Sequence, residues 1–306
     1  MHVLVTGGAG FIGSHTVDRL LAAGARVRVL DNLSSGKVAN LPGEPPIEFV
    51  QGDIRDAATV DAALDGVSHV LQLAAQVSVQ ASVQDPVQSA AINILGFLTV
   101  LEGARRHRVE RFVYASSSAV YGAVDAVPVR EEASLKPISP YGLEKSINER
   151  YAAMYCDLYG MSCLGLRYFN VFGTRQDAGS PYSGVVSRFV SALRSDEPLT
   201  IYGDGHQSRD FIYVEDIAQA NSLALQARWE GVGNVATGQS VSLLQLAGML
   251  SRTAGKPLVV RHLTSRPGDI VHSKGDNTRL CAELGIQGFT SVDTGLRRLW
   301  HAESPT

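Results

Sequence analysis

The residues with the clearest chemical potential are a tyrosine and a lysine four positions apart. Tyr141 and Lys145 follow Ser139 and Pro140, and a serine cap before a first-turn proline is typical of a helix start. On a helix the two side chains share one face. A phenol titrates near pH ~10, but a nearby ammonium favours the phenolate and lowers its pKa. The pair could therefore take a proton from a hydroxyl group, although this spacing alone is common on solvated helices.

Three consecutive serines lie where they could assist that chemistry. Residues 111–115 have the composition of a buried strand, and Ser116, Ser117 and Ser118 follow directly. Ligands of doubly wound sheets bind at the carboxyl ends of the strands. One of these hydroxyls could donate to a substrate hydroxyl held beside Tyr141, or relay its proton. The alternative is a polar turn after a strand.

The beginning of the chain carries a glycine pattern of the kind that binds dinucleotides. Gly7, Gly10 and Gly13 lie between a short apolar strand and a helix-period stretch, and Asp31 ends the next strand. Glycines let the backbone approach a pyrophosphate, the helix N-terminus offers N–H groups, and the carboxylate can hold ribose hydroxyls. Because a carboxylate repels a 2′-phosphate and Asn32 follows it instead of an arginine, NAD is favoured over NADP. The alternative is a turn selected only for tight strand–helix packing.

Elements that could position these groups alternate along the first half. Strand-like runs lie at 2–6, 27–30, 47–50, 67–73, 112–115 and 164–168, with helical patterns at 11–24, 92–106 and 141–159. This alternation predicts an α/β fold, a Rossmann-type doubly wound parallel sheet with helices on both faces. Later elements are shorter, with helices expected at 214–228 and 241–253 and a strand at 258–262. We expect an NAD-binding domain at 1–170 and a smaller α/β substrate domain at 171–306, some segments of which return to the first.

Composition excludes several other classes of protein. The 306 residues are 45% hydrophobic with a formal net charge of −3 and a pI near 6.2, which argues against bulk binding to nucleic acid or anionic membranes. No apolar run approaches the ~18 residues of a membrane span, and no leader segment is visible. Three cysteines cannot all pair, and no cluster of residues suggests a metal site. We expect a soluble cytoplasmic protein without a metal.

The ordered motifs give the chain a family resemblance. It resembles the extended short-chain dehydrogenase/reductase superfamily in its NAD-dependent epimerase/dehydratase branch, and is most similar to the UDP-glucose and UDP-N-acetylglucosamine 4-epimerases. The resemblance runs nearly end to end. The motifs that carry it are 6–13 with Asp31, 52–54, 73–75, 116–122, 141–145, 167–173, 202–216 and 266–269.

The resemblance implies roles for the residues of these motifs. Tyr141 is the expected base and Lys145 the ligand of the nicotinamide ribose, while Ser117 is the catalytic hydroxyl because it lies four residues before the Tyr-Gly pair. The residues expected around NAD are Gly7, Gly10, Phe11, Ile12, Gly13, Asp31, Asn32, Ser35, Gly36, Asp53, Ile54, Leu73, Ala74, Gln76, Tyr141, Lys145 and Tyr168.

The same resemblance implies a site for a sugar nucleotide. Asn170, Arg209 and Arg266 are expected at the diphosphate, where a planar guanidinium suits phosphate oxygens, although a lone arginine is more often a solvated surface residue. Asp269 belongs to the motif of Arg266. Ser273 matches a position beside the C2 substituent of the sugar, where a small residue is associated with N-acetylated sugars and a tyrosine with plain ones.

The implied activity is 4-epimerisation of a UDP-sugar through a transient 4-keto intermediate. The expected substrates are UDP-N-acetylglucosamine and UDP-N-acetylgalactosamine, with UDP-glucose and UDP-galactose as further candidates. Alternatives are a UDP-glucuronate-type epimerase, a net dehydrogenase or dehydratase of the same branch, and a non-catalytic NAD-sensing module. A homodimer is also expected, paired through 92–106 and 141–159, where the available apolar positions include Leu98, Leu101, Tyr151 and Tyr155.

Overall fold

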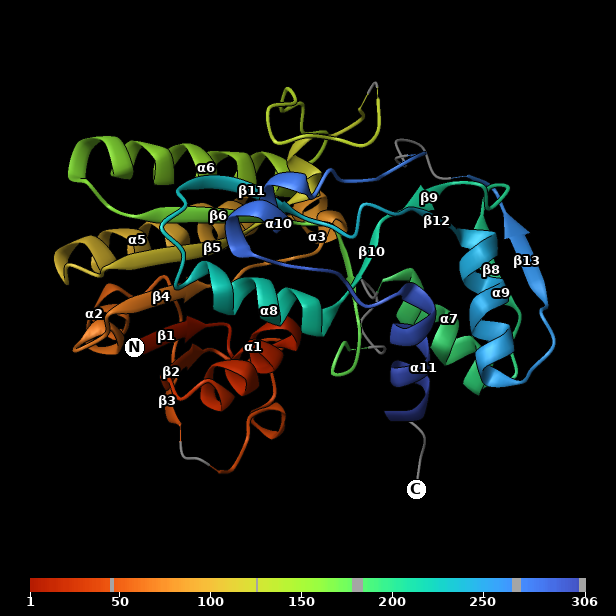
Figure 1. The fold of residues 1–306 in the computed structure, drawn as a ribbon, viewed down its shortest axis with the longest axis horizontal. Coiled ribbons are helices and arrows are strands. Elements are labelled where there is room, and N and C mark those ends of the chain that lie inside the picture. The colour runs from red at the N-terminus through yellow and green to blue at the C-terminus, as the bar shows by residue number, and fades with distance from the viewer. Residues whose placement is uncertain (45–46, 125, 178–183, 266–270, 303–306) are drawn as a thin grey trace.

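A seven-stranded parallel sheet forms the centre of the molecule (Figure 1). The computed structural model describes residues 1–44, 47–124, 126–177, 184–265 and 271–302. The strands in spatial order are β11 (Gly231–Val235), β6 (Cys163–Tyr168), β5 (Arg111–Ser117), β4 (His69–Gln72), β1 (His2–Thr6), β2 (Arg26–Asp31) and β3 (Glu48–Gln51). The order reverses between β1 and β4, which is where doubly wound sheets bind their ligands. The predicted fold class is confirmed.

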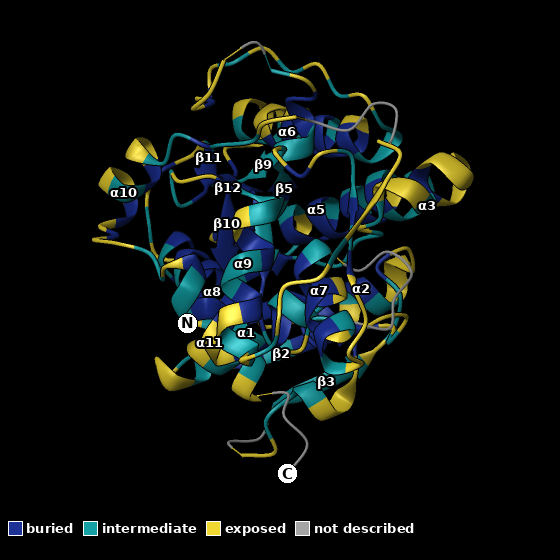
Figure 2. Ribbon diagram, turned by 90° about the vertical axis from the view of Figure 1, so that its right-hand side faces the viewer, coloured by how far each residue is buried: buried dark blue, intermediate teal, exposed yellow. Residues whose placement is uncertain are grey.

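Helices cover both faces of this sheet. On one face lie α1 (Phe11–Ala22), α8 (Val214–Ala224) and α10 (Thr278–Leu284), and on the other lie α2 (Ala57–Leu64), α5 (Phe97–Arg106) and α6 (Pro140–Tyr159). The helices turn buried residues towards the sheet and exposed residues outwards (Figure 2). Two separate apolar cores result, one on each face. The helix that carries the tyrosine and lysine therefore rests on the sheet along most of its length.

The remaining elements form a smaller layer beside the sheet. Three two-stranded pairs join β7 (Asn170–Phe172) to β10 (Phe211–Tyr213), β9 (Ser208–Arg209) to β12 (Val241–Ser242), and β8 (Leu199–Tyr202) to β13 (Val260–Leu263). With α7 (Val185–Arg194), α9 (Leu243–Ala254) and α11 (Val292–Ala302) they enclose a third core. Between these elements the chain crosses back to the main sheet to form α8 and β11. The two regions are thus interleaved in the sequence.

One continuous helix contradicts the expectation that no apolar run is long enough to span a membrane. Pro86–Arg106 comprises α4 (Pro86–Ala90), a π-helical turn (Ala91–Gly96) and α5, and its 21 residues are apolar enough to cross a membrane by length and composition. Within the described residues it is the single helix of that kind. Phe97, Val100 and Leu101 are buried against the sheet, so this helix is a core element of the fold.

A buried ion pair fixes α6 to the sheet. The Arg167 guanidinium of β6 donates two hydrogen bonds to the Glu149 carboxylate of α6, at 2.8 and 2.7 Å. Both residues are less than a tenth exposed. The Ser116 hydroxyl donates to the same carboxylate at 2.5 Å, and Arg167 also donates to the Tyr121 hydroxyl at 2.7 Å. Since its polar partners come from both strands and helix, the pair sets the position of α6 over β5 and β6.

We predict that breaking this pair on one side strongly destabilises the fold. Arg167→Met leaves the Glu149 carboxylate buried without its counter-charge, which typically costs about 3–5 kcal/mol. The double change Glu149→Met with Arg167→Met removes both charges and should be less costly than Arg167→Met alone. Chemical denaturation measures both. As a control, Arg130→Ala breaks an exposed ion pair with Asp276 and should cost less than about 1 kcal/mol. Equal losses for Arg167→Met and the control would contradict this assignment.

Candidate active site

The glycine turn between β1 and α1 has no room for side chains at its tightest point. A Cβ on Gly13 would lie 2.1 Å from the Gly7 carbonyl oxygen, and Gly7 has a φ of +68° and packs on the backbone of Ala74. Gly10 precedes the first turn of α1, and no side chain caps that helix. The backbone N–H groups of the first turn, at Phe11 and Ile12, are therefore available to an anion.

Asp31 binds the turn from the end of β2. Its carboxylate accepts hydrogen bonds from the backbone N–H of Ala9 at 2.9 Å and of Leu33 at 2.8 Å, and the residue is buried. Gly36 approaches so closely that a Cβ there would lie 3.0 Å from the carboxylate. Ser35 beside it is exposed. The structure thus brings Asp31, Gly36 and the glycine turn together as the motif predicts.

A second acidic residue lies beside the end of β2. Asp53 accepts a hydrogen bond from the Asn32 side chain at 3.2 Å and forms an ion pair with Arg55 at 2.8 Å. The hydrogen bonds with Arg55 lower the pKa of Asp53 to about 2, so the carboxylate is ionised. Ile54 is buried beneath it, where it packs against the position of Gly96. Asn32, Asp53 and Ile54, three of the residues expected around NAD, therefore lie together at one edge of the sheet.

The loop after β4 closes the opposite side of the glycine turn. The backbone N–H groups of Leu73 and Ala74 both lie 3.2 Å from the Thr6 hydroxyl, to which they donate. Gln76 donates its backbone N–H to the Asn93 side chain at 2.9 Å. Its side-chain oxygen is buried and has no hydrogen-bond partner in the structure. A buried acceptor without a partner in the chain fits a ligand that donates a hydrogen bond at this point.

The predicted catalytic residues meet at the N-terminal end of α6. Ser139 caps this helix as expected, through a hydrogen bond from Gly142 N–H at 3.2 Å. Tyr141 is hydrogen-bonded to the Ser117 hydroxyl, and Lys145 Nζ lies 5.8 Å from the centre of the Tyr141 ring. Lys145 also donates to the Ala115 carbonyl at 2.9 Å. A hydroxyl, a phenol and an ammonium thus adjoin one another at the carboxyl end of β5.

The titration of these groups differs from the expectation for the tyrosine. Burial raises the pKa of Tyr141, the hydrogen bond with Ser117 lowers it, and the nearby Glu144 carboxylate raises it, so the net pKa lies above its usual value. The residue as a whole is only partly buried, but its hydroxyl is enclosed by protein. Burial lowers the pKa of Lys145 to about 8, against the opposing effects of Glu144 and Glu149. In the protein chain alone burial therefore raises the phenol pKa, and a lowering by the Lys145 ammonium together with an oxidised nicotinamide stays a prediction.

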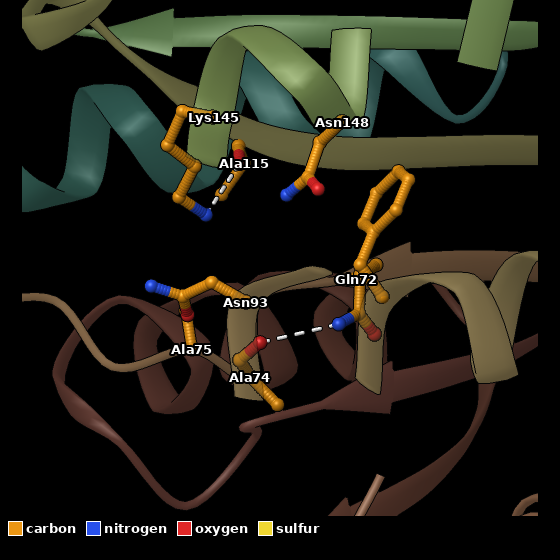
Figure 3. A pocket seen from close by; sticks show the side chains of 8 residues that line it. Gln72, Ala74, Ala75, Asn93, Ala115, Lys145 and Asn148 are labelled. Atoms are coloured by element: carbon orange, nitrogen blue, oxygen red, sulfur yellow. Dashed lines mark hydrogen bonds between the residues drawn. The ribbon is translucent and has the colours of Figure 1, made fainter. Parts of the chain in front are cut away.

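Sequence reasoning missed a buried polar network behind this pair. The Glu144 carboxylate accepts hydrogen bonds from the Ser89 hydroxyl at 2.8 Å and the Asn93 amide at 2.6 Å. Figure 3 shows Lys145 and Asn148 of α6 facing Asn93 across a small pocket, with Ala115 and Gln72 also lining it. The side-chain oxygen of Asn148 is buried without a partner. The available signal was an asparagine within an apolar helix and an acid beside the lysine, on the faces that the helices bury.

Two further predicted residues follow β6. Tyr168 is buried and donates its hydroxyl to Asn221 at 2.6 Å. Burial raises its pKa, to which Tyr141 contributes as a neighbour. Asn170 begins β7 and is partly buried, with its backbone N–H bound to the Asp210 carbonyl at 3.0 Å. Both residues therefore lie between the catalytic end of α6 and the smaller layer.

The predicted substrate end is described in part. Arg209 of β9 donates to the carbonyl oxygens of Ser208 at 3.0 Å and Val271 at 3.4 Å. Ser273 is partly buried, and its backbone N–H donates to the Ser208 carbonyl at 3.0 Å. Arg209 and Ser273 are thus brought to neighbouring segments. Arg266 and Asp269 lie outside the described residues.

These features fit a bound dinucleotide. The glycine turn leaves backbone N–H groups exposed where a side chain would fill the space. The buried side-chain oxygens of Gln76 and Asn148 accept no hydrogen bond from the chain. Asp31 and Asp53 provide carboxylates beside the turn. No group of three or more metal-binding side chains occurs among the described residues. The site can therefore hold a diphosphate-linked nucleotide next to a phenol, a hydroxyl and an ammonium.

The glycine geometry yields a direct prediction. Gly13→Ala should destabilise the protein by about 1–3 kcal/mol more than Gly10→Ala, because overpacking against the Gly7 carbonyl forces the backbone to shift. At Gly10 a Cβ would meet the same oxygen at 3.2 Å, a contact that small adjustments relieve. Thermal unfolding without added nucleotide isolates the packing effect from binding. Equal melting temperatures for the two variants would refute the proposed constraint.

Comparisons with known proteins agree with this geometry. A family model described as the NAD dependent epimerase/dehydratase family matches residues 3–236. The chain is 43% identical over 300 residues to a putative UDP-glucose 4-epimerase of Methanocaldococcus jannaschii, covering 97% of this chain and 96% of that protein.

Solved structures extend the likeness to nearly the whole fold. A UDP-N-acetylglucosamine 4-epimerase from Methanobrevibacter ruminantium, in complex with UDP-N-acetylmuramic acid, is 39% identical with a TM-score of 0.95, and the match covers 98% of both chains. The Thermus thermophilus UDP-glucose 4-epimerase in complex with NAD is 40% identical with a TM-score of 0.91, again over 98% of both chains. With its fold, its glycine turn and its tyrosine–lysine pair, the chain belongs to the NAD-dependent epimerase/dehydratase family.

Proposed function

We propose that this protein interconverts UDP-N-acetylglucosamine and UDP-N-acetylgalactosamine at C4, and that it also accepts UDP-glucose and UDP-galactose. The coarser activity, NAD-dependent 4-epimerisation of UDP-sugars, is common to the relatives described above. The observation that carries the proposal is the contact of Ser117 with Tyr141 beside the charged Lys145. A hydroxyl paired with a phenol suits proton transfer to and from an alcohol.

NAD, when bound, supplies the capacity to accept a hydride from C4 and to return it. The Phe11 and Ile12 N–H groups would hold its diphosphate and Asp31 its ribose hydroxyls. Tyr141 would take the proton of the sugar's 4-hydroxyl, directly or through the Ser117 hydroxyl, and later return it. Lys145 is still mostly protonated at pH 7, because its pKa is about 8, and so provides positive charge beside the developing phenolate.

The alternative activities differ in how much use they would make of these residues. A 4,6-dehydratase needs acidic residues after its catalytic hydroxyl, where this chain has Ser118 and Ala119. A non-catalytic NAD-sensing module would have no need for the Ser117–Tyr141 contact. A UDP-glucuronate-type epimerase or a net dehydrogenase would share the whole apparatus and differ in its sugar. The C4 chemistry that we propose employs every group in the site, and the identity of the sugar separates it from the glucuronate-type alternative.

The decisive test of the activity is incubation with each UDP-sugar without added NAD. The purified enzyme should interconvert the two C4 isomers, detected by chromatography, while the absorbance of NADH stays constant. Steady accumulation of NADH would show a net dehydrogenase, and loss of water from the sugar would show a dehydratase. Conversion at C4 of UDP-glucuronate alone would place the enzyme with the glucuronate epimerases.

Tyr141→Phe should reduce turnover by about 10²–10⁴-fold with the fold intact, because it removes the proton acceptor and keeps the ring. The matched control is Tyr155→Phe, the same change further along α6, where the hydroxyl donates to Glu102 at 3.2 Å. The control should keep wild-type turnover. If Tyr141→Phe remains near wild-type activity, another residue is the base.

The choice of sugar is proposed to depend on Ser273. The segment of Ser273 is held beside β9, which contains Arg209. If Arg209 binds the diphosphate of the substrate, a side chain at position 273 can face the attached sugar. A small serine leaves space for an N-acetyl group at C2. A close-packed wall rejects a bulky substituent more strongly than an added contact attracts one.

Ser273→Tyr should reduce turnover of the N-acetylated pair about 10–200-fold and leave the plain pair nearly unchanged. Ser273→Ala, which stays small, is the control and should act on both pairs as the wild type does. Rates for the four UDP-sugars measured side by side give the answer. An equal decline for both pairs, or a wild type inactive on acetylated sugars, would remove Ser273 from this role.

We also propose a homodimer in the cytoplasm, paired through α5 and α6. Of the expected contact positions, Leu101 is fully buried in the core and cannot reach a partner, whereas Leu98, Tyr151 and Tyr155 are partly buried and pack against the core. Other apolar side chains of the same helices face outwards, and Leu158 is 65% exposed. The exposed set on the π-helical turn and α6 is Leu95, Leu143, Met154, Leu158 and Tyr159. Burying these side chains would favour association.

Sedimentation at micromolar concentration should show a dimer for the wild type and a monomer for Leu158→Asp, because a buried carboxylate at the interface is unpaired. Leu258→Asp places the same charge on another exposed leucine, away from α5 and α6, and should remain dimeric. A monomeric wild type would exclude this pairing.

A further inference from the structure

Two of the three cysteines lie together at the far end of α6 from Tyr141. Cys156 belongs to the last turns of α6 and Cys163 is the first residue of β6, so the short connection through Gly160 turns the chain back on itself. The Gly160 N–H donates to the Cys156 carbonyl at 2.9 Å, with Gly160 at a φ of +65°. The thiol of Cys163 is within hydrogen-bonding distance of the Cys156 sulfur.

A cavity gives small molecules access to both sulfur atoms. Its volume is about 280 Å³, and it lies between α6, β6 and the edge strand β11, with Cys156, Cys163, Arg150 and Val232 in its wall. Cys163 is buried and Cys156 is partly exposed. Met154 and Leu158 of the proposed dimer face lie two residues from Cys156, about 200° around the helix, so these two side chains are on the opposite side of α6. Pairing through that face would leave the cavity open.

The surroundings make the two thiols unequal. Phe112 of β5 lies opposite Cys163, but its N–H donates to the Ser162 carbonyl. The pairing of β11 with β6 begins one residue later, at Leu164. The Cys163 N–H therefore has no partner in either neighbouring strand. The Cys163 thiol and the Cys163 N–H both donate towards the Cys156 sulfur, which lowers the pKa of the Cys156 thiol. The same hydrogen bond to Cys156, together with burial, raises the pKa of the Cys163 thiol. A thiolate is the form that attacks oxidants. Cys156 is thus the attacking sulfur and Cys163 the one that follows.

We propose that Cys156 and Cys163 are a redox-active pair that a hydroperoxide converts into an intramolecular disulfide. The Cys156 thiolate attacks the peroxide, forming an S–O bond as the O–O bond breaks, and the leaving hydroxide takes up a proton. The Cys163 sulfur then attacks the sulfenic acid, forming the S–S bond as the S–O bond breaks. The Cys163 proton leaves with the departing hydroxide as water, so two thiols and one hydrogen peroxide give one disulfide and two waters.

Closing this bond requires little movement. The two thiols are hydrogen-bonded to each other and share the wall of one cavity, so rotation of the Cys156 side chain can bring the sulfur atoms to the ~2.0 Å of a disulfide. The bond would tie the C-terminal end of α6 to β6. Tyr141 and Lys145 lie at the other end of the same helix, so turnover should be retained. The effect of oxidation should therefore be seen in the stability of the helix end, and a thiol such as dithiothreitol should reverse it.

The sequence offers a clean assay for the bond. Arg150 and Arg167 flank both cysteines with no lysine or arginine between them, so trypsin releases residues 151–167 as one peptide, while Cys281 leaves in residues 280–297. The native protein is treated with dilute hydrogen peroxide, blocked with iodoacetamide and digested. We expect peptide 151–167 to lose two hydrogen atoms and take up no iodoacetamide. Cys281, whose pKa burial raises, is the internal control and should be alkylated.

Variants separate the two sulfurs. Cys163→Ser should stop the reaction at the sulfenic acid of Cys156, which dimedone captures, and Cys156→Ser should leave Cys163 reduced and unlabelled. Three results would overturn the proposal: an unmodified dithiol in peptide 151–167, oxidation of Cys156 to sulfinic acid with Cys163 free, or oxidation of Cys281 at the same rate. The mass of peptide 151–167 from the wild-type protein tests the proposal without any variant. The proposal therefore stays testable even if a cysteine variant fails to fold.

Discussion

The position of α6 over the sheet depends on the buried pair of Glu149 and Arg167. Tyr141, Lys145 and Glu149 lie at successive intervals of four residues, so they share the helix face that rests on the sheet. When Glu149 is held by Arg167 and Ser116, the rotation of the helix about its axis is set, and Lys145 can reach only the end of β5. The reactive face is thus fixed by a charge pair that takes no part in the chemistry itself.

The same face contains a balance of buried charges. Burial lowers the pKa of Lys145 and so disfavours its charged form. Glu144 and Glu149, one on either side along the helix, oppose this effect and hold the pKa at about 8. Glu144 is in turn held by Asn93 on the π-helical turn, so that irregular turn has a role in the site. The two carboxylates therefore help to keep the Lys145 amine protonated.

What could be predicted from the sequence was mostly local. The glycines with Asp31, the Ser139 cap and the strand–helix alternation depend on near neighbours, and the structure has each of them. The hydrogen bond of Asn93 to Glu144 joins residues 51 apart, and no local pattern specifies which buried polar groups will meet. Residues 86–106 do not read as one apolar run in the sequence, because Gln88 and Asn93 interrupt it. The raised phenol pKa of Tyr141 depends on burial, which spacing does not reveal.

Specificity and chemistry rest on different parts of the chain. Asp210 is fully buried beside Arg209, and its carboxylate accepts hydrogen bonds from the N–H groups of Thr237, Gly238 and Gly275 at 2.9, 3.1 and 3.2 Å. These bonds join three loops that meet away from α6, and Gly275 is two residues from Ser273. A side chain at 273 is therefore presented from a fixed backbone. The Glu149 network reaches the same loops through Arg167, Tyr121 and Asn234, because the Asn234 amide donates to the Asp276 carbonyl at 3.2 Å. The side chain of residue 273 is not one of the groups in that chain of hydrogen bonds. Its exchange can therefore alter which sugar fits while the proton-transfer groups on α6 keep their positions.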